Sequence, residues 1–308
     1  MRVIYRLQIL ALLIFFIRCS FAIDVAITVD DLPAHGNLPA NLNRTKIAKT
    51  MLAAFKKHGI TGVYGFINGD KVTDSDTRNV LKLWVDSGQL LGNHTYSHMD
   101  INKNTQEQYI ANIKQNEPIL QKLMDDTNYK YFRYPFLREG NTKVKRDTVR
   151  RFLFDNNYKI AEVTMDFWDY EWNNSYSRCM NKQDKNSINY LKRSYLDASI
   201  GAISTAQTLS QLLFKRDIKH ILLLHIGAFD AEMLDQLLTQ YEKRGVKFIS
   251  LQDALSDQIY NINSGTIGNV GYTFLNEIRV SRNLHNPEVV SKFYDSIPEN
   301  RLASICNE

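Results

Sequence analysis

Two aspartates and two histidines are spaced as they would be in a site that binds a metal ion and activates water. Asp30 and Asp31 follow the apolar segment 23–29, and His94-Thr-Tyr-Ser-His98 places two imidazoles four residues apart. On a helical turn this spacing brings both rings to one face, within reach of a single ion. One carboxylate as third ligand leaves a coordination position open, which is typical of catalytic zinc. The second carboxylate is then free for proton transfer, so the pattern indicates metal-assisted hydrolysis.

More polar residues follow other apolar segments, and each has an ordinary explanation when it is taken alone. His225 could be a core histidine with satisfied nitrogens, Arg133 an ion-pair partner, and Asp166 and Asp169 simple turn residues. Asp30-Asp31 alone could start a loop or cap a helix. In α/β folds, however, the chemistry gathers where parallel strands end. The occurrence of all these residues at such ends favours one shared site.

Apolar strand-like segments alternate with amphipathic helical segments along most of the chain. We expect strands at 23–29, 60–67, 90–92, 129–134, 158–165, 221–224 and 246–250. We expect helices at 44–58, 77–87, 104–124, 142–156, 187–215 and 230–243. Asn104 and Glu107 could form a capping box at the start of the third helix. A polar stretch at 171–186 interrupts the alternation, and Gly201 could break the helix at 187–215. The alternation predicts an α/β fold, a distorted (β/α) barrel of about seven parallel strands, with an open doubly wound sheet as the alternative.

The N-terminus has the pattern of a signal peptide over residues 1–22. Arg2 and Arg6 make a basic start, segment 7–17 is apolar but for Gln8, and Ser20-Phe21-Ala22 offers small residues at a cleavage site. The apolar stretch is shorter than the ~20 residues of a spanning helix, although an uncleaved anchor is an alternative. We therefore predict an exported protein, periplasmic or secreted, with no membrane span after cleavage.

Charge and cysteine content narrow the function classes further. Removal of residues 1–22 takes away three arginines and leaves 35 basic against 33 acidic residues, so the net charge is +2 and does not favour nucleic acid as a partner. We expect a catalytic domain at 23–255 and an irregular or partly helical C-terminal extension at 256–308. Cys179 and Cys306 could pair in an oxidising compartment or remain free thiols. The sequence indicates no particular oligomeric state.

Five ordered motifs resemble those of the polysaccharide deacetylases, the NodB-homology group or carbohydrate esterase family four. They span about residues 25 to 250 and are Thr28-Val29-Asp30-Asp31, His94-x-x-x-His98, Arg133-Tyr134-Pro135-Phe136, the segment 166–170, and Leu223-Leu224-His225. Two details depart from the family pattern: Val29 stands where many relatives have Phe, and Asp169 is followed by Tyr170 instead of Trp. The resemblance implies the NodB-homology fold.

The resemblance also implies a role for each matching residue. Asp31, His94 and His98 would hold a divalent metal ion, which would be zinc, cobalt or another transition ion. Asp30 would be the general base that takes a proton from the activated water, and Arg133 would hold Asp30 in place.

In the same scheme the backbone N–H of Phe136 would help to stabilise the oxyanion. His225 would be the general acid that protonates the leaving amine. Asp169, preferred over Asp166, would tune that histidine. His35, four residues after Asp31, would be either an accessory ligand or a loop histidine.

The segment 168–176 carries four aromatic side chains among amides, a composition that suits sugar rings. We assign Trp168, Tyr170, Trp172 and also Tyr134 to substrate binding, with a packed surface loop as the alternative. The implied function is removal of N-acetyl groups from N-acetylhexosamine residues of peptidoglycan, a chitin-like polymer or an exopolysaccharide. The bond cleaved is a linear non-peptide amide. The alternatives are hydrolysis of a small amide or cyclic imide, and a catalytically silent carbohydrate-binding protein.

Overall fold

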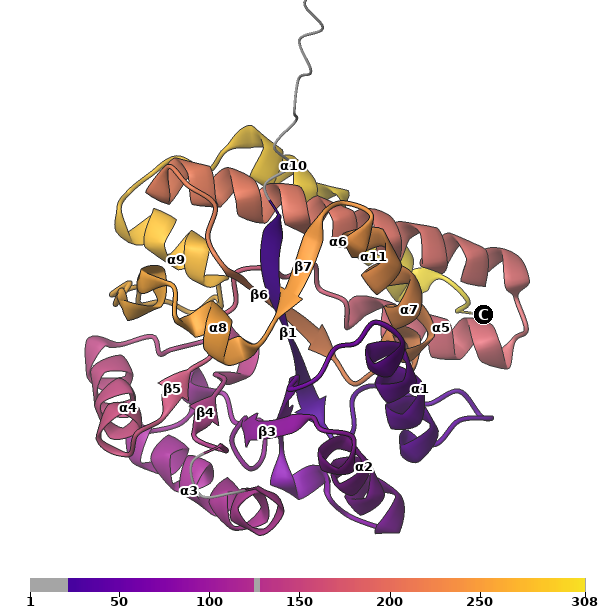
Figure 1. The fold of residues 1–308 in the computed structure, drawn as a ribbon, viewed down its shortest axis with the longest axis horizontal. Helices are drawn as coiled ribbons and strands as arrows, with labels where there is room; N and C mark the ends of the chain where they lie inside the picture. Colours follow the sequence, from indigo (N-terminus) through magenta and orange to yellow (C-terminus); the bar gives the residue numbers. More distant parts are fainter. Residues whose placement is uncertain (1–21, 125–127, 308) are drawn as a thin grey trace, which may run out of the picture.

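Short parallel strands form the centre of the molecule, and helices surround them (Figure 1). The computed structural model describes residues 22–124 and 128–307, so the predicted signal peptide lies almost wholly outside the described residues. The strands are β1 (Ile23–Leu32), β2 (Tyr64–Ile67), β3 (Leu90–Asn93), β4 (Tyr131–Phe132), β5 (Lys159–Ile160), β6 (His220–His225) and β7 (Val246–Ile249). Every expected strand is present, and most are shorter than predicted.

The sheet order is β5-β4-β3-β2-β1-β6, with β7 also paired to β1, and all pairings are parallel. Beyond β5 the chain returns to the other edge, where Met165 forms an isolated parallel bridge with Leu222 of β6. The sheet therefore curls into an incomplete barrel, as predicted, and is not an open doubly wound sheet. β1 is the central strand, buried along nearly its whole length, which explains its continuous β-branched and apolar composition.

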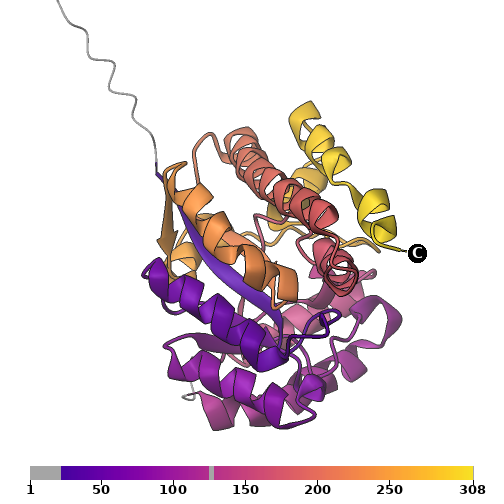
Figure 2. The same cartoon turned by 90° about the vertical axis from the view of Figure 1, so that its right-hand side faces the viewer.

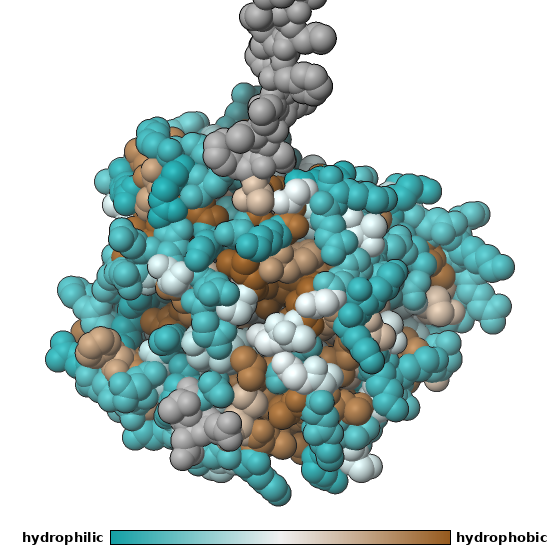
Figure 3. Space-filling model, viewed as in Figure 1, coloured by the Kyte–Doolittle hydropathy of each residue, from teal (hydrophilic) through white to brown (hydrophobic). Residues whose placement is uncertain are grey.

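Helices cover the outside of this barrel. They are α1 (Arg44–Lys57), α2 (Ser75–Asp86), α3 (Gln106–Leu123), α4 (Lys143–Asp155), α5 (Glu171–Asn181), α6 (Lys185–Phe214), α7 (Ala228–Glu242), α8 (Leu251–Leu255), α9 (Phe274–Ser281), α10 (Glu288–Ser296) and α11 (Glu299–Ser304). Seen from the same side, the surface is hydrophilic over the helices and hydrophobic in the centre, over the strands (Figure 3). This pattern is expected when amphipathic helices turn their apolar faces inward.

Three local predictions were wrong. The capping box of α3 is formed by Thr105 and Gln108 instead of Asn104 and Glu107, because the Thr105 hydroxyl accepts from the Gln108 backbone N–H and the Gln108 side chain accepts from the Thr105 N–H. The polar stretch 171–186 contains helix α5. Its buried residues Trp172, Tyr176 and Cys179 recur at helical spacing, a stripe that the surrounding polar residues hide in the sequence.

The third wrong prediction concerns Gly201, which does not break α6. A Cβ atom at this position would lie 2.5 Å from the Phe293 ring, so the glycine allows α10 to pack closely on α6. α10 lies beside α6, and α11 lies beside α5; both helices of the extension are yellow in Figure 2. The extension also contributes Phe293, Ile297 and Leu302 to the main hydrophobic core, and thus it is packed onto the barrel along much of its length.

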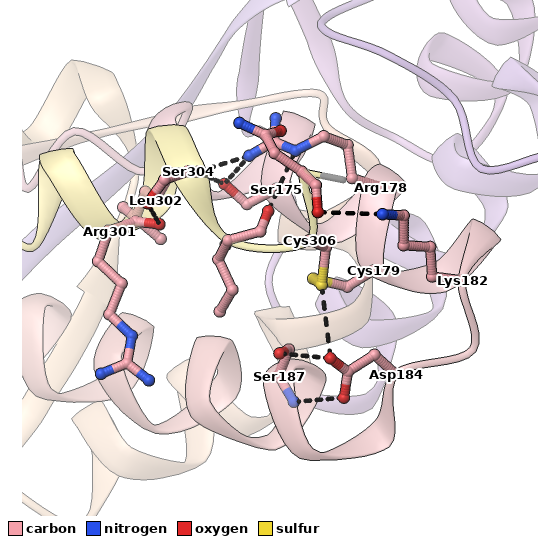
Figure 4. Close-up of a disulfide and its surroundings, with 12 residues drawn as sticks. Ser175, Arg178, Cys179, Lys182, Asp184, Ser187, Arg301, Leu302, Ser304 and Cys306 are labelled. Carbon is pink, nitrogen blue, oxygen red and sulfur yellow. Dashed lines mark hydrogen bonds between the residues drawn. A yellow bond between two sulfur atoms is a disulfide. The ribbon is translucent and has the colours of Figure 1, made fainter.

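The end of the extension is fastened covalently, because Cys179 of α5 and Cys306 form a disulfide (Figure 4). Next to it, the Ser175 hydroxyl donates to the Leu302 carbonyl at 2.6 Å, and Arg178 Nη2 donates to the same oxygen at 2.7 Å. Of the two alternatives that the sequence left open, the structure contains the paired cysteines.

Candidate active site

The predicted site residues gather at the carboxyl ends of neighbouring strands. Asp30 lies in register with His225, because β1 and β6 are adjacent and parallel. His94 follows β3 directly, and Arg133 follows β4 in the same way. Parallel strands deliver their last residues to one edge of the sheet, so residues up to 195 positions apart meet there.

Asp31, His94 and His98 form a compact group of potential ligands. One ligand atom from each lies within 4.8 Å of the others. Asp31 Oδ1 is 3.5 Å from His98 Nε2 and 3.8 Å from His94 Nε2. The histidine pair lies in an irregular turn and not, as expected, on a helical turn: Thr95 and His98 have φ values of 60° and 50°. The rings still converge, since the reversed turn folds the second ring back toward the first.

Electrostatics and hydrogen bonding suit these three residues to a divalent cation. Burial lowers the pKa of His94 well below its usual value and that of His98 to about 4, so both rings are neutral near pH 7. His94 Nδ1 lies 2.8 Å from the Arg133 carbonyl, to which it donates, and this leaves the Nε2 lone pair facing Asp31. Asp31 Oδ1 is buried and has no hydrogen-bond partner among the described residues. Two neutral imidazoles and a carboxylate form a donor set that fits zinc.

Asp31 is kept ionised by its neighbours. Burial acts to raise its pKa, but a 2.8 Å hydrogen bond from His35 Nδ1 and the charge of Lys71 hold that pKa well below the usual value. Lys71 Nζ lies 3.2 Å from Asp31 Oδ1. His35, left open as ligand or loop residue, thus contacts a candidate ligand, and its ring centroid lies 4.8 Å from that of His225.

Asp30 is held by Arg133. Arg133 Nη1 lies 3.1 and 3.2 Å from the two carboxylate oxygens of Asp30. The other guanidinium nitrogens donate to the Ala161 carbonyl at 2.6 Å and to the Thr28 hydroxyl at 3.0 Å, so the group is fully oriented although only 1% of Arg133 is exposed. Burial raises the pKa of Asp30 to about 6 against the opposing charge of Arg133. Asp30 is thus a carboxylate that can accept a proton near neutral pH.

His225 is paired with Asp169. His225 Nδ1 lies 2.8 Å from Asp169 Oδ1, and its backbone N–H donates to Asp169 Oδ2 at 2.6 Å. Asp166 instead accepts a hydrogen bond from the Trp168 backbone N–H at 2.8 Å. The preference for Asp169 over Asp166 as the partner of His225 therefore agrees with the geometry.

A buried acid that the sequence did not single out stands behind this pair. Asp230 accepts a hydrogen bond from the Tyr195 hydroxyl at 2.8 Å and is itself hydrogen-bonded to Asp169. Burial raises the pKa of both carboxyl groups, and the hydrogen bond between them lowers the pKa of Asp169 while it raises that of Asp230. Asp230 therefore holds a proton more readily than Asp169 does. In the sequence this residue is only an acid in the first turn of a helix, a common arrangement.

A pocket of about 450 Å³ opens over these groups. Its wall includes Tyr134, Phe136, Trp168 and Tyr170, along with both aspartates, the three histidines of the motifs and His35. Phe136 has φ 58° and its ring centroid lies 4.4 Å from that of His98. Sequence reasoning missed Val270 and Gly271, which reach the pocket from the extension.

The assignment of Trp172 to substrate binding was wrong. Its side chain is completely buried and packs against Phe167 and Tyr195, and its indole N–H donates to Ser194 at 2.9 Å. Because it lies on the inner face of α5, it is part of the core and does not line the pocket.

Known proteins resemble this chain in sequence and fold. Residues 21–153 match the family model described as polysaccharide deacetylase. A chitin deacetylase of Arthroderma benhamiae is 27% identical over 155 residues, 50% of this chain and 37% of that protein. A peptidoglycan-N-acetylmuramic acid deacetylase of Bacillus subtilis is 24% identical over 213 residues, 68% of this chain and 66% of that protein. The chain thus spans between about a third and two thirds of the length of these curated relatives.

A solved structure shares the fold. The chitin deacetylase from the fungal pathogen Colletotrichum lindemuthianum is 19% identical, and the match covers 76% of this chain and 87% of that chain with a TM-score of 0.50. At this level of identity the likeness concerns the fold alone, and it agrees with the incomplete barrel described above.

Proposed function

We propose that this chain is a metal-dependent hydrolase that removes N-acetyl groups from N-acetylhexosamine residues of a polysaccharide, because residues 21–153 match the polysaccharide deacetylase family model and its curated relatives carry deacetylase names. One observation carries the proposal: an ionised carboxylate and two neutral imidazoles converge in a pocket that also contains Asp30 and His225, both outside the ligand set. Hydrolysis of an amide needs an activated water, a stabilised oxyanion and a proton donor for the amine. The pocket offers a residue for each need.

Asp31, His94 and His98 would hold the ion, with zinc favoured by the donor set. When bound, it supplies positive charge that polarises the acetyl carbonyl and lowers the pKa of water to ~7. Asp30, oriented by Arg133, takes the proton of the attacking water, and its pKa of about 6 suits a general base at neutral pH. The backbone N–H of Phe136 stabilises the oxyanion.

His225 gives a proton to the leaving amine. Asp169 accepts from Nδ1 of the ring, which leaves Nε2 free to donate, and Asp230 holds Asp169 from behind through their hydrogen bond. Trp168, Tyr170 and Tyr134 line the pocket and provide aromatic contacts for the sugar.

Export to an oxidising compartment fits this function. The Cys179–Cys306 disulfide supports it, since such bonds persist mainly outside the cytosol. Within the described part of the chain, no helix combines the length and the apolar character needed to cross a membrane. Glycans of the cell wall or of the surroundings would then be within reach.

The decisive experiment measures acetate release from N-acetylglucosamine oligomers and from peptidoglycan. We expect release by the wild type, loss of release on chelation and recovery with zinc. Asp30→Asn should retain the metal but lose activity by about 10²- to 10⁴-fold, the usual contribution of a general base. Asp24→Asn, which changes a carboxylate on the same strand outside the pocket, is the matched control.

Absence of acetate release from every N-acetylated glycan, with metal bound, would refute the deacetylase proposal. Hydrolysis of a small amide or cyclic imide by the same preparation would then identify the substrate class. Glycan binding without any hydrolysis would instead indicate a carbohydrate-binding protein.

A further inference from the structure

Two residues of the C-terminal extension line the candidate active site. Val270 and Gly271 reach the pocket, whereas the rest of its wall comes from residues 30 to 225. Their segment is tied to the barrel on both sides. Asn102 donates from its side chain to the Gly268 carbonyl at 3.2 Å, and the Phe274 backbone N–H donates to the Val163 carbonyl at 2.6 Å. These bonds hold the segment in place as part of the wall.

Gly271 packs directly on the backbone that carries the candidate oxyanion donor. A Cβ atom at position 271 would lie 1.8 Å from the Phe136 carbonyl oxygen and 3.1 Å from the Leu137 carbonyl carbon. Both neighbours are backbone atoms, which cannot rotate away as a side chain can. Phe136 and Leu137 already have left-handed φ values of 58° and 51°. Any side chain at 271 must therefore shift either the Phe136 backbone or the segment of Gly271, which is itself tied at Gly268 and Phe274.

Val270 adds an exposed apolar group to the pocket. Its side chain is 60% exposed, beside the wall residues Phe136 (49%) and Tyr170 (38%). Deeper in the pocket the groups are carboxylates and imidazoles. Exposed apolar side chains around a polar pocket are typical of a surface that a ligand covers. The apolar faces of sugar rings fit such a rim, whereas a single acetamido group would fill only the polar interior.

A second contact links the extension to the pocket wall. The Trp168 ring lies 5.3 Å from the Tyr294 ring of α10, with 31° between the planes. α10 is itself held against α6 through Phe293 at Gly201. Trp168 thus lines the pocket and also packs against the extension.

We propose that the extension is a wall of the substrate site: Val270 is a specificity-determining contact for sugars next to the reacting one, and Gly271 is a positioning residue for the Phe136 backbone. The inference rests on the proposed deacetylase function and deepens it. It names the substrate class as an oligomer of N-acetylhexosamine long enough to reach the rim, rather than a single sugar.

The test for Val270 compares chain lengths. Val270→Ala should raise KM for an N-acetylglucosamine pentamer by roughly threefold to tenfold, the effect of lost apolar contacts, with kcat unchanged and with KM for the dimer nearly unchanged. Val289→Ala is the matched control, because Val289 is an exposed valine of the same extension that does not line the pocket. It should leave all constants unchanged.

The test for Gly271 separates positioning from binding. Gly271→Ala should lower kcat for every chain length by roughly tenfold or more while the metal content stays at the wild-type value, since loss of one oxyanion donor costs about 10²–10³-fold. An unchanged kcat would overturn the role of Gly271. If this variant fails to fold, the Val270→Ala result still decides the inference.

The outcomes distinguish this inference from the function on which it rests. A wild type that releases no acetate from any glycan disproves the proposed function, and this inference with it. If the wild type is active but KM depends on chain length in the same way in Val270→Ala and in Val289→Ala, the inference alone is disproved.

Discussion

Among residues 22–124 and 128–307, two clusters of acidic or imidazole groups bring potential ligand atoms together, and one of the two has the character of a metal site. In each of them, Asp31-His94-His98 and Glu139-Glu162-Glu277, one ligand atom per residue lies within 4.8 Å of the others. By distance alone they are equivalent. They differ in the kind of donor atom and in the cations around them.

The glutamate cluster is already neutralised. Arg150 Nη1 forms ion pairs with Glu139 and, at 3.4 Å, with Glu162, and Arg146 Nε lies 3.3 Å from Glu139. Burial raises the pKa of Glu162 to about 7 and that of Glu277 well above its usual value, so protons compensate the remaining charge. All three glutamates line a cavity of only about 10 Å³, and Glu162 also lines an outer pocket of about 1170 Å³ together with Arg146 and Arg150. The cluster joins the barrel to α9 of the extension, which carries Glu277.

The histidine cluster differs on each of these points. Its two imidazoles are neutral because burial lowers their pKa values, and its carboxylate is ionised. The cluster opens to a pocket of about 450 Å³. The comparison teaches that proximity of ligand atoms does not make a metal site. Two arginines convert the same geometry into a buried ion network that holds two parts of the chain together.

The largest effect on activity is expected when the histidine cluster loses one of its candidate ligands. His94→Ala should lower acetate release by more than about 100-fold, since loss of groups that merely orient a ligand costs about 10–100-fold. Bound zinc, measured by elemental analysis of the purified protein, should be lost in parallel. Glu162→Gln is the control and should keep its metal. Equal metal loss in both variants would contradict the distinction drawn between the clusters.

Removal of a cation from the glutamate cluster should destabilise the fold. Arg150→Met should lower the free energy of unfolding by about 3–5 kcal/mol, because it leaves buried carboxylates without their partner. Urea denaturation measures the change. Arg151→Met alters an exposed neighbour on α4 and should change stability by no more than about 0.5 kcal/mol. A stability loss no larger than that of the control would show that the arginine does not neutralise the cluster.

The pH dependence of stability should reveal the same cluster. An acid whose pKa is raised by folding binds more protons in the folded than in the unfolded state, so its contribution to stability falls as pH rises. For Glu162 this window runs from its unfolded value of 4.5 to about 7. We expect thermal unfolding of Glu162→Gln to show a smaller decrease in Tm over this window than the wild type. Identical slopes would mean that Glu162 does not titrate as described.

The smallest effect concerns the cation beside the histidine cluster. Lys71 lies 3.2 Å from Asp31 Oδ1, where its charge opposes that of a metal ion. Lys71→Met should therefore tighten zinc binding roughly twofold to fivefold, the range of a partly exposed charge pair, as measured by competition with a chelating dye. Lys57→Met, which affects an exposed lysine paired with Asp235, is the control. Weaker zinc binding would show instead that Lys71 supports the site.

The sequence by itself was enough to predict the barrel and the reactive groups. Apolar periodicity marks strands and helices locally, and parallel strands bring their ends to one edge, so Asp30, Asp31, His94, Arg133 and His225 could be placed together without coordinates. The order of the motifs supplied the resemblance to a family. These inferences need only local pattern and one rule of topology.

Only the tertiary structure decided which neighbours these groups have. Five features depend on how distant segments meet: the choice of Asp169 over Asp166 as partner of His225, the burial of Trp172, the contact of Asp230 with Tyr195, the cysteine pair, and the contact of Gly271 with Phe136. The buried stripe of α5, Trp172, Tyr176 and Cys179, is hard to recognise in the sequence because the other residues of that helix are mostly polar. Residues 270–271 lie more than 130 positions from the loop that they contact. Contacts over such separations are set by packing of the whole chain, which local composition does not encode.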